Sequence, residues 1–244
     1  MLERLEAFAL HLLVSILIAL LAAGLVFFIW YPAPLHTAAG VTSIFLLLLT
    51  IDVILGPTLT LLVYRPGKKT LVMDLGVIAL LQLSALAYGL YTVAEGRPAW
   101  LVFAKDRFEM VRIPEIDDRR LDQAADAYRS ASWFGPEWVG VISPADIEEN
   151  NQILFEALAG GPDIAQRPHL YQPVAQHSEA IRQQAQPLSA LAAFNSPEQI
   201  QQLANRYPTA NGWLPLKAVA QDMTVLVNTG TAAVIAIVDL RPWD

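Results

Sequence analysis

The chain has 244 residues, of which 55% are apolar and 16% are charged, whereas charged residues make up about 25% of an average soluble protein. Residues 1–93 hold four basic and four acidic groups, so residues 94–244 carry the whole net charge of −7. An acidic region without a basic stripe repels phosphate backbones, which argues against a nucleic-acid partner. The chain contains no cysteine, which excludes disulfides, thiolate metal sites and cysteine nucleophiles.

Three apolar runs near the N-terminus are each long enough to cross a lipid bilayer, which takes about 20 residues. We expect membrane-spanning helices at 8–31, 41–64 and 71–93. A cleaved signal peptide is the competing interpretation of the first run, but apolar sequence continues past the small residues at 22–24 as far as Tyr31. We therefore expect a retained span.

The two short loops between these runs differ in charge. Arg65, Lys68 and Lys69 lie in the loop at 65–70, whereas residues 32–40 contain no lysine or arginine. Because positively charged loops tend to stay in the cytoplasm, we expect the 65–70 loop and the N-terminus to lie there. Three spans then send residues 94–244 to the other side, which is the periplasm if the membrane is a bacterial inner membrane.

The part beyond the third run shows strand and turn signals. The apolar runs 100–103 and 108–113 predict a β-hairpin, and 138–142 predicts a short strand. A second hairpin is expected between 223–227 and 231–240, which are separated by an Asn-Thr-Gly turn.

Helix signals lie between these strands. Apolar residues at i, i+3, i+4 and i+7 predict a helix over 121–128. Ser143 and Ser196 are each followed by proline and then by an acid or amide three residues on, so both are predicted N-caps. The expected fold class is a membrane-anchored α+β protein, with three transmembrane helices in 1–93 and a soluble domain in 94–244 that has a mainly antiparallel sheet and packed helices.

A few residues interrupt the apolar spans. Asp52 lies near the middle of the second run, where a carboxylate costs about 2.5–3.5 kcal/mol on insertion scales. It therefore needs a partner, such as Gln82 of the third run or Thr50, or it is protonated. Asp74 lies one turn inside the third run, and Gly56-Pro57 should kink the second. The candidate contacts with a helix of a partner protein are Asp52, Gly56, Pro57, Asp74 and Gln82. The alternative is internal: hydrogen bonds for Asp52, and a helix cap or an interfacial position for Asp74.

We expect no catalytic, cofactor or metal site. Two intramembrane aspartates invite comparison with aspartyl proteases, but Asp52 and Asp74 lie at different depths and the Gly-x-Gly-Asp pattern of those proteases is missing. The soluble part contains no Gly-x-Ser-x-Gly elbow and no glycine-rich phosphate loop. The sequence therefore predicts a protein that is not an enzyme.

The membrane part and the first hairpin carry motifs of a known family. They are Trp30-Tyr31-Pro32, the stretch from Asp52 to Thr60, Arg65-Pro66-Gly67-Lys68-Lys69, Asp74 through Gly89, Arg97-Pro98, and Val102 through Phe108, with Arg167 to Pro173 as a further piece. Residues 28–108 thereby resemble the type IV pilin accessory proteins of the TfpX/TfpZ type. The resemblance implies an inner-membrane protein, without known enzymatic activity, that supports pilus assembly or pilin stability. The implied partners are a major type IV pilin, selected by the variable soluble domain, and other pilus assembly proteins.

The sequence is compatible with two functions. The leading one is a pilin-specific assembly factor or chaperone-like protein, and the alternative is a membrane-anchored sensor or ligand-binding domain. A sensor needs a cytoplasmic output, yet the expected cytoplasmic parts are a short N-terminus and the six-residue loop at 65–70. This favours the assembly factor.

Overall fold

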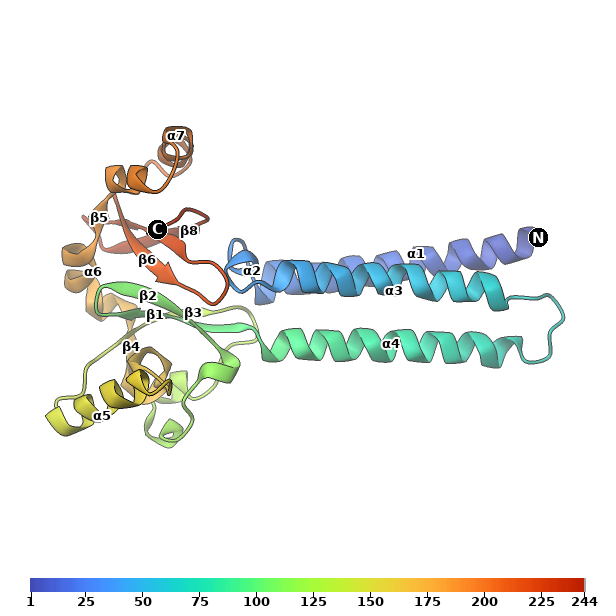
Figure 1. Ribbon diagram of the computed structural model, residues 1–244, viewed down its shortest axis with the longest axis horizontal. Coiled ribbons are helices and arrows are strands. Elements are labelled where there is room, and N and C mark those ends of the chain that lie inside the picture. Colours follow the sequence, from blue (N-terminus) through green and yellow to red (C-terminus); the bar gives the residue numbers. More distant parts are fainter. Residues whose placement is uncertain (244) are drawn as a thin grey trace. The chain divides into compact units, whose positions relative to one another are not determined.

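The computed structural model describes residues 1–243, and three long apolar helices dominate its N-terminal part (Figure 1). Helix α1 (Leu2–Gly24) continues into a π-helical segment (Leu25–Trp30) and is followed by α3 (Val41–Val63) and α4 (Leu71–Glu95). Each is long and apolar enough to cross a membrane. The three predicted apolar helices are therefore confirmed.

The chain forms two compact units. The first contains Met1–Trp30 and Gly40–Gly96, and the second contains Tyr31–Ala39 together with the chain from Arg97 onward. The segment that links the first two long helices thus packs with the soluble domain.

In the first unit, α3 packs against both α1 and α4. The close approach of α3 and α4 depends on Gly89, because a Cβ there would lie 2.1 Å from Cδ1 of Leu48. The Arg4 guanidinium of α1 donates two hydrogen bonds, of 3.1 and 2.5 Å, to the carbonyl of Leu61. That carbonyl is one of the last four in α3, which have no donor within a regular helix. Arg4 therefore caps the end of α3.

The described part of the second unit is built on an eight-stranded sheet with the order β4-β3-β1-β2-β6-β7-β8, in which β5 also pairs with β6. The strands are β1 (Pro98–Ala104), β2 (Arg107–Arg112), β3 (Glu137–Val141), β4 (Tyr171–Pro173), β5 (Gln186–Pro187), β6 (Gly212–Lys217), β7 (Met223–Asn228) and β8 (Ala233–Val238). The pairs β1/β3 and β2/β6 are parallel and the others are antiparallel. The mainly antiparallel sheet is confirmed, as are both predicted hairpins and the strand β3.

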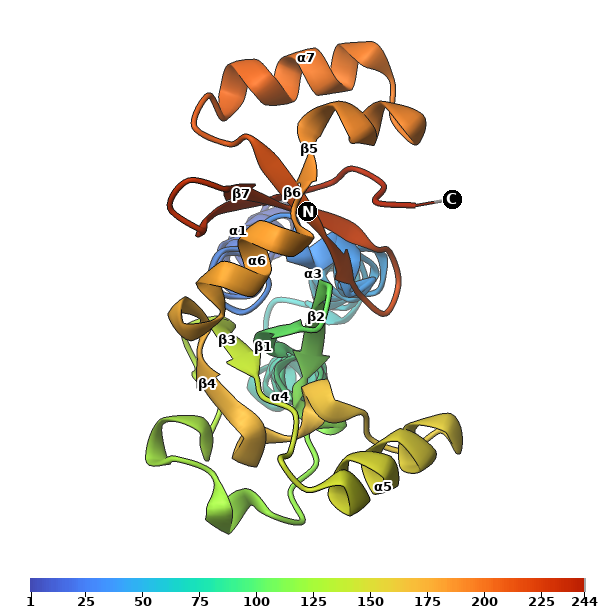
Figure 2. The same cartoon turned by 90° about the vertical axis from the view of Figure 1, so that its left-hand side faces the viewer.

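The α-helices of the second unit are α2 (Leu35–Ala38; Figure 1), α5 (Ile147–Leu158), α6 (Ser178–Gln184) and α7 (Pro197–Arg206) (Figure 2). Helix α7 begins as predicted, because the Ser196 hydroxyl accepts a hydrogen bond from the Gln199 main chain. Helix α5 begins about one turn later than predicted. Its N-cap is Asp146, whose carboxylate accepts from the main chain of Glu148 at 3.0 Å. Ser143 is therefore not a cap, since the backbone at Asp146 is still extended.

The predicted helix at 121–128 is wrong. Two short 3-10 turns, Leu121–Gln123 and Asp126–Tyr128, occupy this segment, and the backbone of Ala124 and Ala125 between them is extended, with ψ of 148° at both. Ala124 is buried, and the Tyr128 ring packs edge-on against Trp100 at a centroid distance of 5.9 Å. Ala124 and Tyr128 face the core as the spacing indicates, whereas Ala125 is exposed. Tertiary packing rather than a continuous helix holds the buried side chains there.

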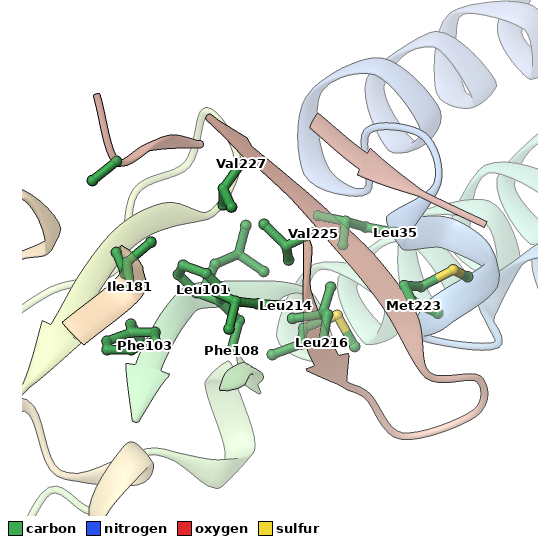
Figure 3. Close-up of a cluster of buried hydrophobic side chains, with 13 residues drawn as sticks. Leu35, Leu101, Phe103, Phe108, Ile181, Leu214, Leu216, Met223, Val225 and Val227 are labelled. Carbon is green, nitrogen blue, oxygen red and sulfur yellow. The ribbon is translucent and has the colours of Figure 1, made fainter. Parts of the chain in front are cut away.

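The short helix α2 belongs to the core of the second unit (Figure 3). Leu35 is 2% exposed and Ala38 is fully buried. The carbonyl of Ala38 accepts a hydrogen bond of 2.9 Å from the main chain of Ala220. The other labelled members of this cluster are Leu101, Phe103, Phe108, Ile181, Leu214, Leu216, Met223, Val225 and Val227.

Candidate functional site

Five polar side chains, contributed by all three long helices, meet in the first unit. They are His11 and Ser15 of α1, Asp52 and Thr60 of α3, and Gln82 of α4. Gln82 Nε2 donates to Ser15 Oγ at 3.0 Å and to the Asp52 carbonyl at 3.1 Å, and it lies 3.5 Å from the Asp52 carboxylate. His11 Nε2 lies 2.9 Å from Gln82 Oε1, and His11 Nδ1 lies 2.6 Å from Thr60 Oγ1. We call this set the Gln82 network.

The chemistry of the partners fixes the direction of these hydrogen bonds. A main-chain carbonyl only accepts, so the Gln82 amide nitrogen must face Asp52, and its oxygen must face His11. Since that oxygen also only accepts, His11 Nε2 donates to it, and the Thr60 hydroxyl lies within hydrogen-bond distance of His11 Nδ1. The Gln82 amide and the His11 ring are therefore hydrogen-bonded within the helix unit, which lowers the cost of burying these polar groups.

Gly56 allows Gln82 to reach this position. A Cβ at Gly56 would lie 1.9 Å from Gln82 Oε1. Pro57 follows inside α3, and both residues are buried. Three of the candidate contact residues, Asp52, Gly56 and Gln82, therefore cluster where α3 meets α4, and Pro57 follows Gly56 in the chain.

An open groove of about 630 Å³ lies beside the network and is lined by all three helices. Its lining residues are Glu3, Glu6, Ala7, Leu10, His11 and Val14 of α1, Thr60 of α3, Tyr64 directly after α3, and Leu75 and Ala79 of α4. At 1.5 Å per residue, the α1 wall from Glu3 to Val14 is about 16 Å long. We call it the α1–α4 groove. Most of the groove wall is apolar, and His11 and Thr60 supply polar atoms. The carboxylates of Glu3 and Glu6 line its end at the start of α1.

Asp52 lines a second, smaller groove of about 290 Å³ between α3 and α4. The other lining residues are apolar: Ile44, Leu47, Leu48, Ile51, Ala85 and Leu86. The Asp52 side chain is partly exposed. Its carboxylate is thus the polar group of a groove that is otherwise apolar.

Asp74 does not join the Gln82 network. Its Oδ2 lies 2.6 Å from Lys68 Nζ and accepts a hydrogen bond of 3.1 Å from the Thr70 hydroxyl. Asp74 therefore ties the basic 65–70 loop to the first turn of α4. Arg65 and Lys69, the other basic residues of that loop, are exposed.

Sequence reasoning did not identify His11, Ser15 and Thr60 as parts of the site. A signal was present, because His11 is one of four histidines in the chain and lies in an apolar helix, with Ser15 one turn further on the same face. Which helix they would contact is not a local property of the sequence.

Arg167, the first residue of the motif from Arg167 to Pro173, belongs to an ion-pair cluster in the second unit. Arg167 lies 3.1 Å from the Asp117 carboxylate and 2.5 Å from that of Glu156, and Arg119 binds the same two carboxylates at 2.7 and 2.8 Å. Hydrogen bonds from Arg119 and Arg167 lower the pKa of Glu156 to about 2, and Arg119 holds the pKa of Asp117 below its usual value. These acids stay ionised and paired at neutral pH, so the cluster is suited to holding segments together and not to proton transfer. Within residues 1–243, no three histidine or carboxylate side chains gather as a metal site.

The chain is similar to known fimbrial assembly proteins. The sequence profile described as fimbrial assembly protein FimB matches residues 1–40, which include α1 and α2. The fimbrial assembly protein of serogroup I from Dichelobacter nodosus is 36% identical over 181 residues, which cover 73% of this chain and 70% of the relative. The chain belongs to the fimbrial assembly protein family.

Two further relatives from the same organism support this assignment. The serogroup E1 protein is 35% identical over 192 residues, covering 78% of this chain and 74% of the relative. The protein of serogroups C1 and C2 is 40% identical over 119 residues, covering 48% of this chain and 88% of the relative. Family membership confirms the resemblance to the type IV pilin accessory proteins. No solved structure matches the chain.

Proposed function

We propose that this protein is a non-enzymatic assembly factor of type IV pili, which binds its cognate major pilin in the inner membrane in a chaperone-like manner. Membership of the fimbrial assembly family supports the role in pilus assembly. The main support for a contact with the pilin is the α1–α4 groove. The resemblance implies a partner that is held in the membrane by an apolar helix. The groove is open and mostly apolar, and it lies in the unit formed by the three long helices.

The shape and charge of the groove suit an apolar helix with a positive end. Ala7 and Ala79 in its walls are small, so a partner backbone can come close, as small residues allow at helix interfaces in lipid. Glu3 and Glu6 line the first turn of the α1 wall and are exposed. Carboxylates there attract a cationic group, such as the terminal amine of a processed pilin, which the family resemblance puts near the cytoplasmic face.

The candidate contact residues take different parts in this proposal. Gln82, with Gly56 and Pro57 beside it, holds the three helices in the arrangement that forms the groove. Asp52 offers a polar contact in the smaller groove between α3 and α4. Asp74 could bind a pilin amine only in exchange for Lys68, so Asp74→Asn is expected to weaken pilin binding less than the removal of both glutamates.

We further propose the orientation that the loop charges favour. The basic 65–70 loop and the N-terminus lie in the cytoplasm, and the domain in 94–244 lies in the periplasm. The spans in 1–93 would then hold any pilin generically, because contacts between helices in lipid are worth only about 0.6–2 kcal/mol each. The soluble domain would select the pilin, so exchanging that domain between relatives should change which pilin is served.

Co-purification of the full chain with its pilin from detergent-solubilised membranes tests the proposal. Ala79→Trp fills the α1–α4 groove, and Ala85→Trp fills the smaller groove beside Asp52. Ala87→Trp is the matched control, because it adds the same side chain to an exposed position of the same helix. We expect Ala79→Trp to reduce the recovered pilin several-fold and Ala87→Trp to leave it unchanged.

The other outcomes separate the parts of the proposal. Loss with Ala85→Trp alone would move the pilin to the smaller groove. Equal pilin recovery with all three variants would show that neither groove binds it, and no recovery with the unaltered chain would contradict the pilin contact altogether.

A further inference from the structure

Two aromatic side chains of the second unit are exposed next to each other. Trp133 is 57% exposed and Phe134 is 88% exposed. They lie in the loop that precedes β3, where the Ser132 hydroxyl accepts a hydrogen bond of 3.0 Å from the Phe134 main chain. Exposing two large aromatic rings to water is unfavourable, because such rings bury about 150–250 Å² each when they pack.

A buried arginine fixes where this loop lies. Arg97 is 4% exposed, and its Nε and Nη2 donate to the Ser132 carbonyl at 3.4 and 3.5 Å. Its guanidinium carbon lies 4.0 Å from the centre of the Trp133 ring. The loop is therefore held against Arg97, the residue at which the second unit resumes after α4.

The chain itself places Arg97 close to the membrane surface. Arg97 is two residues beyond Glu95, the last residue of α4, and two residues span at most about 7 Å. The headgroup region of a bilayer is about 5–7 Å thick on each side of the hydrocarbon core. Since α4 is a membrane-spanning helix by its length and composition, the Trp133 ring cannot be far from the headgroups.

A third exposed apolar side chain, Val219, is next to a residue that is hydrogen-bonded to the chain just before another long helix. Val219 is 53% exposed, and its neighbour Ala220 is hydrogen-bonded to the carbonyl of Ala38. Ala38 is three residues before Val41, the first residue of α3. Two separate points at which the chain enters a long helix thus have exposed apolar side chains beside them.

We propose that Trp133 and Phe134 insert into the lipid headgroup region and anchor the soluble domain to the bilayer surface, with Val219 as a smaller contact. Aromatic rings favour this zone, where the apolar ring meets the acyl chains and the indole N–H meets polar groups. The soluble part carries a net charge of −7, so attraction to anionic lipids cannot hold it there. The contact is apolar and should be insensitive to salt.

The absence of cysteine from the chain allows a direct test. Phe134→Cys in the full chain is labelled with an environment-sensitive fluorophore and placed in vesicles of phosphatidylethanolamine and phosphatidylglycerol. Leu158→Cys is the matched control, because Leu158 is also a large apolar residue and is 75% exposed on α5. Circular dichroism checks that both labelled proteins keep their fold.

We expect the label at 134 to be quenched by nitroxide-bearing lipids and to be several-fold less sensitive to aqueous iodide than the label at 158, at both low and high salt. Equal access of iodide to both positions would overturn the proposal. Protection from iodide without quenching by the lipids would also overturn it, because the loop would then be covered by protein.

Discussion

Replacing Gly56 by alanine should loosen the three-helix unit. The new Cβ would lie 1.9 Å from Gln82 Oε1, which is the far end of a flexible side chain, so the amide moves and the backbone stays. Moving the amide separates Gln82 from His11, from Ser15 and from the Asp52 carbonyl. The cost is therefore the loss of three hydrogen bonds between helices.

The expected magnitude is small but measurable. Hydrogen bonds between membrane helices average about 0.6 kcal/mol, so three are worth about 2 kcal/mol. Alanine is better than glycine in a helix by about 1 kcal/mol, which offsets half of that loss. The free energy of unfolding should therefore fall by about 1 kcal/mol.

Titration of the full chain with sodium dodecyl sulfate in mixed micelles, followed by circular dichroism, measures this change. Gly76→Ala is the control, because a Cβ at that position in α4 meets nothing within 4 Å, and it should be neutral or stabilising. In a Gln82→Ala background, Gly56→Ala should no longer destabilise the protein. An equal loss with and without the Gln82 side chain would refute the reasoning.

Alkaline phosphatase fused after Trp243 should be active, and fused within 65–70 it should be silent; the reverse pattern would invert the proposed orientation. Leu35→Ala should destabilise the second unit by about 2–4 kcal/mol in thermal or chemical unfolding, because the side chain is buried in its core. A negligible loss would mean that α2 contributes little to that core. The lowered pKa of Glu156, about 2 against 4.5, means that its ion pairs stabilise fully above pH 4.5 and that this contribution is lost as the pH falls toward 2. Glu156→Gln should therefore reduce the loss of stability between pH 4.5 and 2, measured as the unfolding free energy at a series of pH values. An unchanged pH dependence would contradict the role of the Glu156 ion pairs.

The parts of the fold that could be predicted have local signals. The apolar runs define the three long helices, and the capping box that begins at Ser196 starts α7 as expected. At 121–128 the same kind of signal fails, because helical spacing of apolar residues is also met by two turns that press Ala124 and Tyr128 into the core. Helical spacing therefore predicted neither the backbone of this segment nor the burial of all its apolar residues, since Ala125 is exposed.

The central strand β6 had no usable signal, since Pro215 argues against a strand inside a sheet. The structure resolves this conflict through its pairing. Strand β5 pairs with Gly212 and Trp213, and β2 pairs with Leu216 and Lys217. Pro215 falls between these two pairings and lies opposite Thr224 of β7.

The candidate site was predictable in part. The costs of a buried carboxylate and of a kinked helix singled out Asp52, Gly56 and Pro57. They left Gln82 and Thr50 as partners of Asp52, and the structure shows Gln82. The contact between His11 and Gln82 joins residues 71 positions apart. It depends on which faces of three uniformly apolar helices meet, and their sequences are too uniform to define those faces.

The central claim is that a pilin helix lies in the α1–α4 groove, and photocrosslinking in living cells tests it most directly. Val14 lines the groove, so a photoreactive amino acid at this position would face a helix bound there. Leu13 is also exposed on α1 but does not line the groove, so the same group at position 13 is the control. We predict a crosslinked product that contains the pilin from position 14 and none from position 13. Equal crosslinking from both positions, or pilin crosslinked from 13 alone, would contradict docking in this groove.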